Sequence, residues 1–150
     1  MAEVIEELLV LTQSDAVIRN VVVDKNLSRD LPRVRGNRIQ LQQVVLNLFM
    51  NGCEAMDDVE LDGRVLVIRA FAEQPGIVVV EITDRGHGLT EEAAKRVFEP
   101  MFTTKPGGLG MGVPIARTIV EAHGGTLTAR NNPVRGATFR FTLPAEGEKS

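Results

Sequence analysis

The 150-residue sequence contains no tryptophan, no tyrosine, one cysteine (Cys53) and two histidines. Without Trp and Tyr, most of the stacking platforms that bind single-stranded nucleic acid are missing, and the formal charge of -3 also argues against a nucleic-acid partner. A single cysteine can form neither a disulfide within the chain nor a thiolate metal cluster, so we expect a reducing, cytoplasmic setting. Neither histidine has a metal-ligating residue at a useful spacing.

Long apolar runs are also missing, and the sequence shows no signal peptide, transmembrane segment, internal repeat or low-complexity stretch. Hydrophobic residues make up 43% and charged residues 25% of the chain, which is the balance of a soluble globular protein. We therefore expect one domain with a substantial core and no direct insertion into a membrane.

Hydrophobic patterning predicts helices and strands that do not alternate as they do in a parallel α/β protein. Two pairs of strands are joined by short turns, as in hairpins. The sequence therefore predicts an α+β fold, a two-layer sandwich with helices on one face of a mixed, mostly antiparallel sheet. The expected helices cover residues 3–17, 39–56, 91–99 and 114–123, and the expected strands cover residues 18–24, 64–72, 77–83, 127–131 and 137–143.

The central helix, residues 39–56, is apolar nearly all round but carries a stripe of amide side chains. Gln43, Asn47 and Asn51 follow one another at intervals of four residues, so they lie on one face. A buried amide without a partner costs about 1–3 kcal/mol. For one amide, neighbouring loop backbone is the expected partner, but three in register favour a polar ligand. Asn37 is a suitable N-cap for this helix.

A carboxylate and two glycines follow the strand at residues 77–83. Asp84 ends this strand, and Gly86 and Gly88 come directly after it. A carboxylate at this place can accept a hydrogen bond from an exocyclic amine such as that of adenine. Taken alone, the pattern fits an ordinary turn at the end of a strand equally well.

A second glycine motif, residues 108–112, precedes the helix that contains Pro114. Backbone amides at a helix N-terminus can bind phosphate, and Lys105 could contact a terminal phosphate. The motif is not a P-loop, because no Gly-Lys-Ser/Thr follows, and it is not a dinucleotide fingerprint, because no strand precedes it. Taken alone, it also fits a flexible linker, and we expect residues 103–111 to be the most mobile stretch.

In this order the motifs resemble the ATP-binding catalytic domain of sensor histidine kinases. LQQVVLNLFMNGCEAM resembles the N box of that family, DRGHGL its first glycine box, VFEPMFTTK its F box and GGLGMGV its second glycine box, while IVEAHGGTL and GATFRFTLP resemble its usual ending. The resemblance covers residues 3–144. It is strongest to the nitrogen- and oxygen-responsive subgroup, in which the N box ends in EAM and the lid begins with TTKP.

The resemblance implies the Bergerat ATP-binding fold, ATP and Mg2+ as cofactors, and a role for each matching residue. Asn51 would bind Mg2+, Asn47 and Lys105 would act at the phosphates, Asp84 would accept the adenine amine, and Thr138 would reach the adenine through water. The expected ATP-binding residues are Asn47, Asn51, Asp84, Gly86, Gly88, Leu89, Thr104, Lys105, Gly108, Leu109, Gly110, Met111, Gly112 and Thr138. Departures from the family pattern are Asn37, Gly52, Glu54 and Met101, and Glu54 replaces a lysine that often holds phosphate.

The family carries its phosphoacceptor histidine on a preceding helical hairpin, followed by Glu or Asp, and neither His87 nor His123 fits that context. We therefore expect residues 1–17 to be the end of a linker helix from a missing upstream dimerisation domain, residues 18–144 to be the ATP-binding domain, and residues 145–150 to be a tail. The fragment would be monomeric and its parent a homodimer.

The resemblance implies a kinase that donates the γ-phosphoryl group of Mg-ATP to a histidine on the dimerisation domain and so acts indirectly on a response regulator. One alternative is an ATP-driven clamp like those of gyrases and heat-shock chaperones. Those relatives carry a glutamate base where this chain has Asn47, and an amide cannot take a proton at neutral pH. The other alternative is a non-catalytic nucleotide-sensing module.

Overall fold

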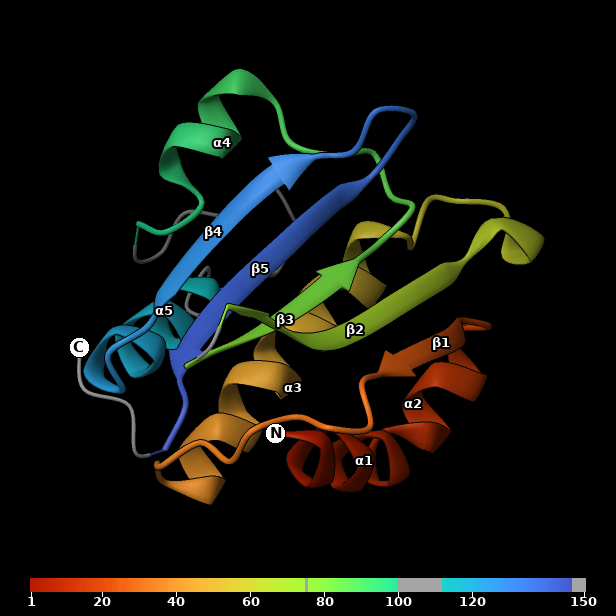
Figure 1. The fold of residues 1–150 in the computed structure, drawn as a ribbon. Helices are drawn as coiled ribbons and strands as arrows, with labels where there is room; N and C mark the ends of the chain where they lie inside the picture. Colours follow the sequence, from red (N-terminus) through yellow and green to blue (C-terminus); the bar gives the residue numbers. More distant parts are fainter. Residues whose placement is uncertain (75, 100–111, 147–150) are drawn as a thin grey trace.

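The computed structural model describes residues 1–74, 76–99 and 112–146, which form one five-stranded sheet flanked by helices (Figure 1). In chain order the elements are α1 (Ala2–Leu11), α2 (Gln13–Ile18), β1 (Val22–Leu27), α3 (Arg38–Ala55), the 3-10 helix η1 (Leu61–Gly63), β2 (Val65–Gln74), β3 (Ile77–Thr83), α4 (Glu91–Arg96), α5 (Gly112–Ala122), β4 (Thr126–Asn131) and β5 (Ala137–Pro144).

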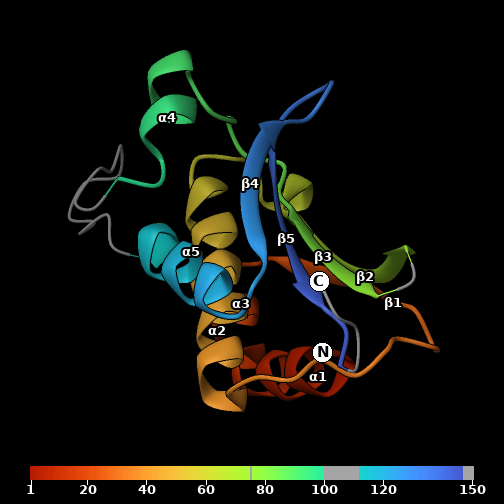
Figure 2. The same cartoon turned by 60° about the vertical axis from the view of Figure 1, so that its left-hand side comes forward.

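The strands lie in the order β1-β2-β3-β5-β4. β1 pairs with β2 in parallel, and the other three pairs are antiparallel. Figure 2 shows α1, α3 and α5 on the same side of the sheet, and within the described residues no helix covers the opposite face. The predicted fold class, a two-layer α+β sandwich with a mostly antiparallel sheet, is confirmed.

α3 is the centre of the helical layer. Val44, Val45, Leu48 and Phe49 on this helix are 0% exposed, and they pack in one core with the inner faces of the strands. Its first turn is capped as predicted, because the side chain of Asn37 accepts a hydrogen bond from the backbone N–H of the third helical residue at 3.0 Å.

The N-terminal segment differs from the sequence prediction. The helix expected over residues 3–17 is broken at Thr12, whose buried hydroxyl donates to the carbonyl of Leu8 at 2.9 Å, a local bond that competes with regular helix geometry. The strand expected over residues 18–24 was also placed wrongly, because Ile18 ends α2 and Asn20 adopts a left-handed conformation, φ 57°. The β-branched run therefore enters the sheet only at Val22.

The later helices differ from their predicted bounds by a few residues, because α4 ends at Arg96 rather than at residue 99 and α5 begins at Gly112, two residues before Pro114. The hydroxyl of Thr90 caps α4 by accepting the N–H of Ala93 at 3.0 Å, and α5, whose buried residues include Ala116 and Val120, packs on α3. Gly124, with φ 82°, follows the end of α5. None of the helices in residues 1–74, 76–99 and 112–146 is long and apolar enough to cross a bilayer.

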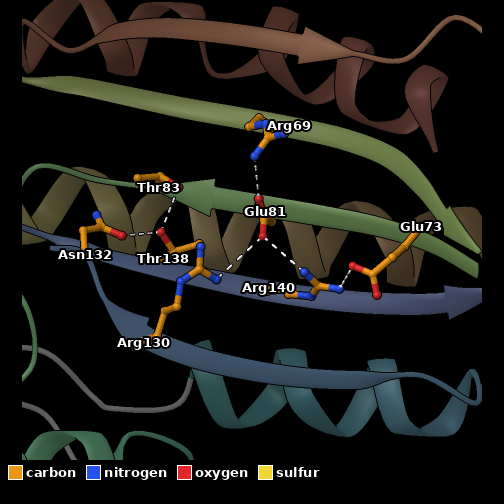
Figure 3. Close-up of polar contacts among 8 residues, drawn as sticks. All are labelled: Arg69, Glu73, Glu81, Thr83, Arg130, Asn132, Thr138 and Arg140. Carbon is orange, nitrogen blue, oxygen red and sulfur yellow. Dashed lines mark hydrogen bonds and ion pairs between the residues drawn. The ribbon is translucent and has the colours of Figure 1, made fainter.

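A buried carboxylate lies on the sheet face that the helices leave open (Figure 3). Glu81, in the central strand β3, is only 5% exposed, and its side chain pairs with Arg69 at 3.1 Å, Arg140 at 3.5 Å and Arg130 at 3.6 Å. A buried charge is tolerated when it is paired in this way. Glu73 is the second carboxylate partner of Arg140, so a network of ion pairs lies on the open face.

We predict that Cys53 is unreactive in the folded chain. The thiol lies on α3, is 1% exposed, and burial raises its pKa to about 11, so the nucleophilic thiolate is scarce at pH 8. Titration with a chromogenic disulfide reagent at pH 8 should label less than about a tenth of the protein in minutes and all of it after unfolding in guanidinium chloride. Rapid full labelling of the native chain would contradict this burial.

Candidate functional site

The candidate site begins at Asp84, the residue that follows β3. Its side chain is 2% exposed, and Oδ1 accepts hydrogen bonds from the backbone N–H groups of Gly86 at 2.8 Å and Ala137 at 3.2 Å. The backbone N–H of Asp84 donates to the carbonyl of Ala137 at 3.0 Å. These bonds fix the carboxylate between the end of β3, the following loop and the start of β5.

α3 lies close to this carboxylate. A Cβ on Gly52 would be in ordinary contact with Cβ of Asp84 at 3.7 Å but only 2.5 Å from Cδ1 of Leu66, so Gly52 leaves room for the Leu66 side chain between helix and sheet. A Cβ on Gly86 would lie 2.3 Å from the carbonyl oxygen of Ala55. The loop after β3 therefore packs against the C-terminal end of α3.

The amide stripe lies on the same helix. Nε2 of Gln43 donates to Oδ1 of Asn47 at 2.8 Å, and Nδ2 of Asn47 donates to the carbonyl oxygen of Gly112 at 2.9 Å. Asn47 thus joins α3 to the first residue of α5, so part of the stripe is satisfied by neighbouring loop backbone, the simpler of the two explanations. Asn51 is half-buried one turn further along, next to Gly52.

These contacts bring most of the described candidate residues to one region. Asn47 and Gly52 are separated by about 7.5 Å along the helix axis, and they contact the start of α5 and Asp84, respectively. The region is therefore bounded by α3, the loop after β3 and the N-terminal end of α5, where the helix dipole favours an anion. The candidates Thr104, Lys105, Gly108, Leu109, Gly110 and Met111, and the stretch expected to be most mobile, lie outside the described residues.

Thr138 has a different setting from the one expected. Its hydroxyl bonds to Oγ1 of Thr83 at 2.9 Å and to Oδ1 of Asn132 at 2.6 Å, and Figure 3 shows these groups on the open face of the sheet, beside the Glu81 network. Its neighbours Ala137 and Phe139 face the core instead, as the alternation of a strand requires. The side chain of Thr138 therefore points away from the face on which α3 packs.

Sequence reasoning missed Asn131 and Asn132. The side chain of Asn131 accepts the N–H of Leu89 at 2.7 Å and donates to the carbonyl of Leu89 at 2.8 Å. Nδ2 of Asn132 donates to the carbonyl of Asp84 at 3.2 Å. In the sequence Asn131 ends a predicted strand and Asn132 begins the turn before Pro133, a composition typical of a turn. Nothing marked them as partners of a loop more than 40 residues away.

The histidines have backbone partners. Nδ1 of His87 lies 2.8 Å from the carbonyl of Gly88, and Nδ1 of His123 lies 2.8 Å from the carbonyl of Ile119. Nε2 of His123 also accepts the N–H of Asn37 at 3.1 Å, so this imidazole joins the end of α5 to the start of α3. Across the described ranges, no three His, Cys, Asp or Glu side chains are grouped so that they could hold a metal ion.

Comparison with known families gives the class of the domain. The family described as "Histidine kinase-, DNA gyrase B-, and HSP90-like ATPase" matches residues 36–147, about three quarters of the chain. The chain belongs to this family.

Individual relatives narrow the class to histidine kinases. The sensor protein TdiS of Thauera aromatica is 42% identical over 95% of this chain, and the sensor protein FixL of Bradyrhizobium diazoefficiens is 39% identical over 99% of it. The chain spans only 26% and 29% of those two proteins, respectively. The expected resemblance to sensor histidine kinases is confirmed.

Similar solved structures are also histidine kinases. A mycobacterial sensor histidine kinase, MprB, superposes with a TM-score of 0.83 at 27% identity, covering 97% of this chain and 94% of that one. The catalytic domain of histidine kinase ThkA superposes with a TM-score of 0.82 at 29% identity, covering 96% and 93%. The chain is therefore a domain of the histidine kinase catalytic type.

Proposed function

We propose that this domain binds Mg-ATP and presents the γ-phosphoryl group to a histidine on a separate phosphoacceptor domain of its parent kinase. The observation that carries the proposal is the buried carboxylate of Asp84, held by two backbone N–H groups beside α3. Family membership supports ATP as the ligand. The arrangement supplies a fixed acceptor for the base at one end and amide side chains with a helix N-terminus for the phosphates at the other.

Asp84 is suited to recognise adenine because a carboxylate accepts hydrogen bonds at two oxygens and at about four lone-pair positions. Oδ1 accepts the backbone N–H groups of Gly86 and Ala137, which fix the carboxylate in place, and an exocyclic amine is a donor of the kind that a carboxylate accepts. Guanine has a carbonyl at the corresponding position, which would face the carboxylate as a second acceptor. The site would therefore favour adenine over guanine.

Asn47 and Asn51 are suited to the phosphate end. Mg2+ prefers oxygen ligands and is often held by few protein groups together with phosphates, so the amide oxygen of Asn51 fits it chemically. When bound, the metal neutralises charge on the transferred phosphoryl group. Asn47 would act at the phosphates from its position beside the start of α5, and Lys105 and residues 108–112 would cover the triphosphate.

Phosphoryl transfer is favoured over rapid ATP hydrolysis because the site has no general base at the place where hydrolytic relatives carry glutamate. That place is Asn47, which already donates to the carbonyl of Gly112 and cannot accept a proton at neutral pH. Glu54 lies nearly two turns further along α3, too far to replace it. The asparagine at position 47, where those relatives carry glutamate, also counts against an ATP-driven clamp.

The proposed partners follow from the relatives. A solved complex of histidine kinase ThkA with the response regulator TrrA matches all of this chain at 29% identity and a TM-score of 0.80. By analogy, the domain would phosphorylate a histidine on the parent's dimerisation domain, and a response regulator would take the phosphate from there. We propose that the parent protein is a homodimer and that this domain lies in the cytoplasm. The isolated domain is proposed to be monomeric.

Replacing Asp84 by Asn should weaken Mg-ATP binding about 30-fold, because a hydrogen bond to a charged acceptor contributes about 2 kcal/mol. Isothermal titration calorimetry measures the affinity, and thermal unfolding without nucleotide tests whether the loop survives the change. Asp24→Asn, on the exposed side of β1, is the matched control and should bind as the unmodified chain does. Equal affinity in the Asp84 variant would remove this carboxylate from the site.

The chain alone should neither label itself nor hydrolyse ATP quickly, since transfer requires an acceptor positioned in line with the leaving group. After incubation with γ-labelled ATP the chain should carry no label, whereas an added histidine hairpin from a related sensor kinase should gain acid-labile phosphate. Label that persists on His87 or His123, or fast turnover that survives Asn47→Ala, would overturn the assignment.

A further inference from the structure

Two consecutive asparagines at the β4–β5 turn hold both ends of the loop that follows β3. At the far end, the side chain of Asn131 forms a pair of hydrogen bonds with the backbone of Leu89, 2.7 Å to its N–H and 2.8 Å to its carbonyl. A neighbouring strand would bond to the N–H and the carbonyl of a residue in the same way, but here one amide side chain makes both bonds. It fixes the backbone of Leu89 in position and in orientation.

At the near end of the loop, Asn132 holds the backbone of Asp84. Its Nδ2 donates to the carbonyl oxygens of Asp84 and Arg135, both at 3.2 Å, and its Oδ1 accepts the hydroxyl of Thr138 at 2.6 Å. The hydroxyl of Thr83 joins Thr138 at 2.9 Å, as Figure 3 shows. The backbone that carries the Asp84 carboxylate is thus tied to the turn through a chain of side-chain hydrogen bonds.

The loop and the turn are in close contact. A Cβ on Gly88, whose φ is 79°, would lie only 2.9 Å from Oδ1 of Asn131. Without such contacts, residues 84–89 would keep the freedom of a surface loop, and ordering them on binding would cost conformational entropy. Fixing them beforehand removes that cost from the binding of a ligand.

We propose that Asn131 and Asn132 are positioning residues for base recognition, which hold the loop of residues 84–89 in the form that recognises adenine. The inference rests on the proposed function, because it takes Asp84 as the contact to the base. Asn131 bonds to the backbone of Leu89, and Asn132 bonds to the backbone of Asp84 and to the hydroxyl of Thr138, so both are proposed to act through the loop and not by contact with the nucleotide. Removing either side chain should therefore weaken the contribution of the base to the affinity. The contribution of the phosphates, which would lie near Asn47 and α5, should stay unchanged.

The test compares Mg-ATP with Mg-tripolyphosphate, which has the phosphates but no base. Asn131→Ala should lose about fivefold in affinity for Mg-ATP and keep its affinity for Mg-tripolyphosphate in a competition assay. Asn26→Ala, at an exposed position of β1 on the opposite edge of the sheet, is the matched control and should bind both ligands normally. In the Asn131 variant the amide resonances of Gly86 and Leu89 should shift in NMR spectra without nucleotide.

Asn131→Asp provides a second variant if the alanine variant folds poorly. It has the same shape and keeps an acceptor for the N–H of Leu89, but it places an oxygen against the carbonyl of Leu89, so it should also lose affinity for Mg-ATP selectively. Unchanged Mg-ATP affinity in folded variants, or an equal loss for both ligands, would overturn the positioning role. An unmodified chain that bound no Mg-ATP would instead overturn the proposed function and this inference with it.

Discussion

The structure depends on how the carboxylate of Asp84 is held at the end of the central strand. One oxygen accepts the N–H groups of Gly86 and Ala137, so a single charge joins β3, the loop after it and the start of β5. The carboxylate is almost completely buried, and backbone donors with α3 replace the water it has lost. A buried acceptor arranged in this way selects a ligand that can donate a hydrogen bond.

The contacts of α3 place this helix against the Asp84 carboxylate. The apolar face of α3 packs on the inner face of the sheet, Gly86 permits the close approach of the loop after β3 to the end of α3, and Asn47 connects the same helix to the start of α5. The proposed base end and the proposed phosphate end of the site therefore share one helix. The open sheet face is stabilised separately, by the arginines paired with Glu81.

Much of this arrangement was predictable from sequence because it rests on local patterns. The hairpins, the Asn37 and Thr90 caps and the buried stripe of α3 follow from periodicity and short-range hydrogen bonding. The break at Thr12 and the left-handed Asn20 depend on single side-chain and backbone choices that periodicity does not register. The orientation of Thr138 and the contacts of Asn131 and Asn132 depend on strand register and on pairing across more than 40 residues, which one sequence does not reveal.

The most direct test of the account is a crystal structure of the chain with Mg2+ and a non-hydrolysable ATP analogue. The account predicts that the exocyclic amine of adenine lies about 3 Å from the carboxylate of Asp84, that the amide oxygen of Asn51 is a ligand of the metal, and that Asn131 still holds the backbone of Leu89. An adenine ring bound elsewhere, with no contact to Asp84, would contradict it.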